Sequence, residues 1–73
     1  MYKVKVDVTE IARFETLKQA LNFCLLANIH NRNDTMIFDC DEYGNIISIF
    51  GNNAGTNHNL ITAIKRELLG MEG

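Results

Sequence analysis

The sequence predicts one small α+β domain of the order β-α-β-β-α, in which a three-stranded mixed sheet carries two helices on one face. Three observations lead to this fold class. Apolar and polar residues alternate over positions 2–8, apolar residues recur at helical spacing within 14–25 and 60–68, and Gly44 separates two apolar runs as a hairpin turn would. A chain of 73 residues has room for a single domain spanning its whole length.

The first predicted element is a half-buried strand over residues 2–8. Successive side chains of a strand point to opposite faces, so one face is apolar and the other is exposed to water. The apolar face holds Tyr2, Val4, Val6 and Val8, and the polar face holds Lys3, Lys5 and Asp7.

A helix is predicted next, and Thr16 followed by Gln19 fits a capping box at its start. An Asn-rich segment, residues 28–34, ends it, because asparagine side chains compete with helical hydrogen bonds. Three apolar residues, Phe23, Leu26 and Ile29, lie off the main stripe, which indicates a second covered side. The main stripe consists of Phe14, Leu17, Leu21, Cys24 and Leu25.

Residues 35–41 and 46–50 are predicted to be antiparallel strands, with Gly44 in the left-handed position of the turn. A loop over 51–57 leads to a final helix that Gly70 stops. Its stripe consists of Leu60, Ile61, Ala63, Ile64 and Leu68.

The helix between the first two strands is expected to cross over and make them parallel, with both helices on one sheet face. We expect Met36, Phe38 and Cys40 to face the helices, so that Ile37 points to the open face. The strand 46–50 is apolar on both sides, since Ile47 and Ile49 oppose Ile46 and Phe50. An open sheet face this apolar is typical of a contact surface.

The net charge is −2, and the lysines and arginines are dispersed along the sequence. Nucleic acid is therefore not expected as a partner, because clustered cations supply non-specific affinity for phosphates. No apolar run reaches the roughly 18 residues of a membrane span, and no signal-peptide layout precedes the first strand, so we expect a cytoplasmic protein without a membrane partner. Cys24 and Cys40 lie among apolar neighbours in different elements and are expected to be buried, reduced thiols.

Two segments resemble ligand loops in part. Residues 39–46 begin like a calcium loop, but Tyr43 and Phe50 stand where oxygen ligands are needed. Residues 51–56 lie between a strand and a helix, as phosphate loops do, but no lysine precedes Thr56. A weaker site for an anion or small ligand is a hypothesis for the small polar residues there, namely Asn52, Asn53, Thr56, Asn57 and His58.

The remaining chemistry-bearing residues do not form a pattern. His30 and His58 are the only histidines, too few for a converging metal site, and Ser48 lacks the glycines of a nucleophile elbow. We therefore predict no catalytic residue, no metal ligand and no cofactor.

The function expected from these observations is a non-catalytic protein-interaction module, such as a small regulator or inhibitor of a larger protein among bacterial or phage accessory proteins. The alternative is a small-ligand or anion-binding protein that uses the loop Gly51–Asn57. A homodimer is also expected, because a core this small needs stabilisation from elsewhere. The residues predicted to form an interface, with itself or with a protein partner, are Phe23, Leu26, Ile29, Ile37, Ile47 and Ile49.

Overall fold

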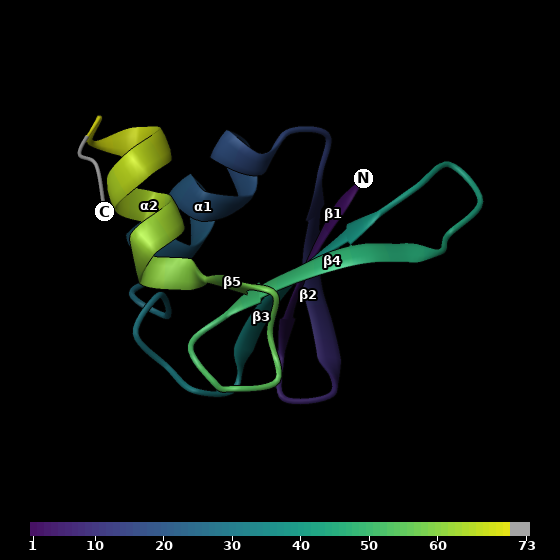
Figure 1. Ribbon diagram of the computed structural model, residues 1–73, viewed down its shortest axis with the longest axis horizontal. Helices are drawn as coiled ribbons and strands as arrows, with labels where there is room; N and C mark the ends of the chain where they lie inside the picture. The colour runs from purple at the N-terminus through teal and green to yellow at the C-terminus, as the bar shows by residue number, and fades with distance from the viewer. Residues whose placement is uncertain (71–73) are drawn as a thin grey trace.

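A computed structural model of the protein describes residues 1–70 and contains two helices and a mixed sheet (Figure 1). The sheet has five strands in the order β2-β1-β3-β4-β5, antiparallel except for the parallel pair β4 and β5. The α+β class is confirmed, whereas the prediction of three strands is wrong. The elements are β1 (Tyr2–Val6), β2 (Thr9–Phe14), α1 (Leu17–Leu26), β3 (Thr35–Cys40), β4 (Ile46–Gly51), β5 (His58–Asn59) and α2 (Leu60–Leu68).

The strand missing from the prediction, β2, follows β1 after a tight turn at Asp7 and Val8. Asp7 has a φ of 58°, a left-handed conformation that aspartate tolerates better than most residues. Val8, predicted to continue the apolar face of the first strand, lies in this turn and is 80% exposed. A turn of two residues without glycine gives little sequence signal, so the alternation over residues 2–8 predicts a continuing strand where the chain in fact reverses.

Because β2 reverses the chain before α1 begins, the crossover helix connects β2 to β3 and not β1 to β3. Both of these strands pair antiparallel with β1, which lies between them. The predicted parallel pairing of the first strand with the strand at 35–41 is therefore wrong. The hairpin of β3 and β4 is antiparallel as predicted, and Gly44 in its turn has a φ of 84°.

Both helices cover one face of the sheet, α1 over β1 and β2 and α2 over β4 and β5 (Figure 1). Thr16 caps α1 as predicted: its hydroxyl accepts from the Gln19 amide, and the Gln19 side chain accepts from the Thr16 amide, both at 3.2 Å. Phe14 belongs to β2, not to the helix, and its ring lies 5.4 Å from that of Phe23. Gly70, with a φ of 67°, follows the end of α2 as predicted.

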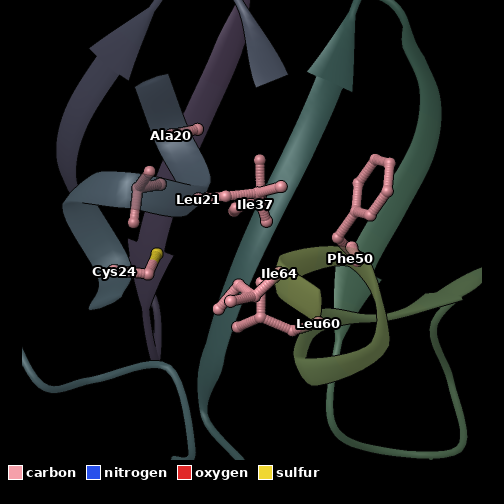
Figure 2. Close-up of a cluster of buried hydrophobic side chains, with 9 residues drawn as sticks. Ala20, Leu21, Cys24, Ile37, Phe50, Leu60 and Ile64 are labelled. Atoms are coloured by element: carbon pink, nitrogen blue, oxygen red, sulfur yellow. The ribbon is translucent and has the colours of Figure 1, made fainter. Parts of the chain in front are cut away.

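The core lies between the helices and the sheet, where Ile37 is enclosed by side chains of both helices (Figure 2). Ile37 pairs with Val4 on one side and with Phe50 on the other, and residues paired across strands share a face. The expectation that Ile37 points to the open face is therefore wrong, and Met36 and Phe38 point there instead. The buried apolar cluster comprises Val4, Ala20, Leu21, Cys24, Ile37, Phe50, Leu60, Ala63 and Ile64.

Candidate functional site

The loop between β4 and β5 uses its side chains to bind other parts of the chain. The side-chain NH₂ group of Asn52 donates to the backbone carbonyl oxygens of His30 and Arg32, at 2.8 and 3.1 Å. The side-chain NH₂ group of Asn53 donates to the backbone carbonyl oxygen of Asn33 at 3.2 Å. These bonds tie the loop to the segment between α1 and β3, so much of the donor capacity predicted for a ligand stabilises the fold.

Gly51 has a packing role at the start of this loop. A side chain there would place its Cβ 2.6 Å from Cγ2 of Thr56 and 3.3 Å from Cγ of Met36. The Thr56 hydroxyl donates to the carbonyl oxygens of Asn53, at 2.9 Å, and Gly51, at 3.3 Å. Thr56 therefore folds back on the end of β4, and the glycine is explained by this close approach without any phosphate.

The last two predicted ligand residues, Asn57 and His58, line a cleft of about 410 Å³ beside α2. The His58 ring stacks on the Phe50 ring, with centroids 4.7 Å apart and planes 26° apart. The apolar part of the lining comes from Leu17, Phe50 and Ala63. Arg66 and Glu67 of α2 contribute opposite charges. Of the five predicted residues, the structure thus brings only these two to a cleft.

The predicted interface residues are spread over the molecule. Leu26 and Ile47 are exposed, at 78% and 64%, on α1 and β4. Phe23 and Ile29 are half-buried and pack against the core. Ile37 is completely buried beneath the helices, so it is not available to a partner. Ile49, half-buried on β4, belongs to the open face of the sheet, where it pairs with Phe38.

The open face carries a half-buried apolar stripe across its two middle strands. Phe38 of β3 pairs with Lys3 of β1 on one side and with Ile49 of β4 on the other. Met36 lies two residues before Phe38 on the same face of β3 and pairs with Lys5. None of these side chains is covered by a helix, because both helices lie on the opposite face. We call this surface, formed by Lys3, Lys5, Arg13, Met36, Phe38 and Ile49, the open-face patch.

Cations border the apolar stripe along β1 and β2. Lys5 Nζ lies 5.0 Å from the centroid of the Phe38 ring, within the range of a cation–π contact. Arg13 pairs with Lys3 across the strands and forms an ion pair with Glu10. Its hydrogen bond to Glu10 lowers the pKa of that carboxyl, to which Lys3 and Lys5 contribute as well. Three cations and one carboxylate thus lie along β1 and β2 on this face, while Asp41 and Glu42 line the cleft next to Lys3 and Arg13.

The sequence contained a signal for the cations but not for the stripe. The alternation in β1 placed Lys3 and Lys5 on an exposed face. On β3, Thr35, Ile37 and Asp39 alternate with three apolar residues, Met36, Phe38 and Cys40. This pattern predicts that the side with the three apolar residues is buried, which is wrong. Only the register that pairs Val4 with Ile37 identifies the covered face.

The titratable groups do not converge on a metal or a nucleophile in the described part of the chain. Residues 1–70 contain no group of three His, Cys, Asp or Glu placed to hold a metal ion. Both cysteines are free and buried, as predicted, with Cys24 against the helix-covered face and Cys40 on the other. Burial raises the pKa of the Cys24 thiol to about 11, which is unfavourable for a nucleophile.

Comparison with family models, curated proteins and solved structures finds no match to this chain. Within residues 1–70, neither helix has the length and apolar character needed to cross a bilayer.

Proposed function

We propose that the protein is a non-catalytic interaction module that binds a larger protein through the open-face patch and thereby regulates or inhibits it. The observation that carries this proposal is the uncovered apolar stripe of Met36, Phe38 and Ile49 beside three cations. Aromatic residues, methionine and arginine are the types enriched in protein interfaces. An apolar sheet face of this kind gains free energy when a partner removes it from water.

The charge distribution defines the chemistry of the partner. The chain has seven lysines and arginines and a net charge of −2, yet three of its cations lie on this one face. Glu10 is the acidic residue paired with Lys5 there, and it is engaged by Arg13. Complementary potentials accelerate association and fix the register of an interface. The partner surface is therefore apolar at its centre and acidic around it.

This charge pattern favours a foreign partner over a second copy of the chain. Two open-face patches in contact would bring six cations together with two Glu10 carboxylates, an excess of positive charge, and juxtaposed like charges cost free energy. The homodimer expected from the sequence stays a prediction and would need another surface, such as the exposed Leu26 on α1. Nucleic acid is less favoured because Phe38 is the only aromatic ring of the patch and Lys5 already lies over it, whereas single-strand binders stack successive bases.

A comparative pull-down tests the proposal. The wild-type protein and a Lys3→Glu, Lys5→Glu variant are used to recover partners from extracts of the cells that make the protein. The matched control is Lys18→Glu, Lys65→Glu, which makes the same charge change at exposed positions on the helices. We expect a protein recovered by the wild type and the control to be lost with the patch variant.

The outcomes separate the alternatives. Equal recovery by all three proteins would contradict the use of this face. Sedimentation equilibrium at micromolar concentration that gives twice the 8.3 kDa chain mass, lowered by Lys3→Glu, would replace the foreign partner with self-association through the patch. Binding of a labelled single-stranded RNA at physiological salt, lost in the same variant, would assign the patch to nucleic acid.

A further inference from the structure

The cleft beside α2 is a separate feature of the helix-covered side. Its volume, about 410 Å³, falls within the range of roughly 300–1,000 Å³ typical of small-molecule sites. Phe50 forms an apolar wall and is only 9% exposed, while His58 continues that wall as a ring stacked on it. A flat or compact apolar group fits against such a surface.

The polar groups of the cleft are mostly donors. The side-chain oxygen of Asn57 accepts from the Ile49 amide at 2.8 Å, and that of Asn59 accepts from the Thr62 amide at 2.9 Å. Each bond occupies one lone pair of the asparagine oxygen and leaves the side-chain NH₂ group, which can only donate. Thr62 adds a hydroxyl to the lining.

The charged residues at the cleft act in opposite senses. Arg66 lies in the last turn of α2, is exposed, and forms no ion pair within residues 1–70. A guanidinium with free donors matches the two oxygens of a carboxylate. Glu67, the next residue, also lines the cleft and disfavours an anion there. The charges of Arg66 and Glu67 cancel at a distance. The remaining donors of the cleft and the two parallel N–H groups of Arg66 therefore favour a ligand with an anionic head group.

We infer that this cleft binds a small organic carboxylate with an aromatic or compact apolar body, held by Arg66 and the donors around it with its body against Phe50 and His58. This inference goes beyond the proposed function, since the cleft and the open-face patch lie on opposite sides of the sheet. It also moves the ligand site expected in the loop 51–57 to the cleft that follows the loop. The residues common to both are Asn57 and His58.

The test uses benzoate as the probe, with benzamide as its uncharged counterpart and inorganic phosphate as an anion without an apolar body. Each is titrated into ¹⁵N-labelled protein, and amide chemical shifts are followed by NMR. Benzoate should shift the amides of residues 57–67 with a Kd of about 1–10 mM, which is reasonable for a fragment of this size. Benzamide and phosphate should bind at least about tenfold more weakly.

Variants assign the binding to individual groups. Arg66→Gln should weaken benzoate binding by about tenfold, whereas Glu67→Gln should strengthen it. Lys65→Gln is the matched control, because it removes the same charge from a neighbouring exposed residue that does not line the cleft. The inference is overturned if benzamide binds as well as benzoate, or if Lys65→Gln and Arg66→Gln weaken benzoate binding equally. It is also overturned if the chemical-shift changes map to the open-face patch. The absence of any shift at about 20 mM benzoate, well above the expected Kd, would overturn it as well.

Discussion

The two faces of the sheet are built from alternate residues of the same strands, yet they differ in every physical respect. Ile37 is completely buried under the helices, whereas its neighbour Phe38 is half-buried on the open face, with Lys5 over its ring. The covered face is apolar and contains no lysine or arginine in its buried cluster. The open face combines an apolar stripe with cations. The difference teaches that the apolar content of one strand does not identify its core side, because the neighbouring strands and the helices decide it.

The sharpest way to break this comparison is to remove the same atoms from each face. Ile37→Ala should lower the free energy of unfolding by about 2–5 kcal/mol, since it leaves a cavity in a packed core. Ile46→Ala should cost less than about 1 kcal/mol, because Ile46 pairs with Cys40 of the open face and is 53% exposed. Urea unfolding followed by circular dichroism measures both. Similar losses for the two variants would contradict the assignment of faces.

A second substitution tests where a loop reaches the open face. Gly51→Ala should destabilise the protein by about 1–3 kcal/mol, because the added Cβ would meet Thr56 at 2.6 Å. Gly55→Ala, in the same loop, places its Cβ at 3.4 Å from the Asn53 side chain and serves as the control. We expect little change in its thermal midpoint. If Gly51→Ala were as stable as the control, Thr56 would not pack where the structure places it.

The reaction rates of the two cysteine thiols with a thiol reagent provide a further comparison of the two faces. Cys24 is completely buried and its pKa is raised to about 11, so little thiolate exists at neutral pH. Cys40, 4% exposed, borders a cleft of about 280 Å³ with Lys3 and Arg13 on the open face. Native thiol titration should show Cys40 reacting first, and Cys40→Ser should abolish that phase. Two thiols should react after denaturation, and equal native rates would argue against the difference in access.

The smallest effect on stability is expected when the pH is lowered and Asp41, in the turn between β3 and β4, becomes protonated. Hydrogen bonds to the Asp41 carboxylate, first from the Asn45 amide and also from the Tyr43 amide, lower the pKa of that group. Because the pKa of Asp41 is lower in the folded state, its charged carboxylate stabilises the fold fully at a pH above the unfolded-state pKa of about 4. This stabilisation is lost as the pH falls through the folded-state pKa. The stability difference between wild type and Asp41→Ala should therefore shrink below about pH 4. A pH-independent difference in urea unfolding would contradict this role.

The parts of the fold that were predictable are those specified by local chemistry. The capping box of Thr16, the turn glycine Gly44 and the stripe of α2 each involve residues a few positions apart. Two short elements, β2 after a turn without glycine and the two-residue β5, lack such local signals. Missing β2 reversed the direction predicted for β1 relative to β3, and the three apolar residues that alternate with Ile37 on β3 led to the wrong face for Ile37. The candidate site failed for the same reason, because the open-face patch joins residues from four strands through their register.

The position of β1 between β2 and β3 also determines how its backbone exchanges with solvent. Its neighbours accept and donate on both sides, while β2 has one free edge. An amide in a strand paired on both sides is released only when a large part of the sheet opens, whereas an edge strand frays locally. Deuterium should therefore enter the outward-facing amides of β2 rapidly, whereas those of β1 should exchange only through the small population of globally unfolded molecules. The first strand of the chain would then report the stability of the whole domain.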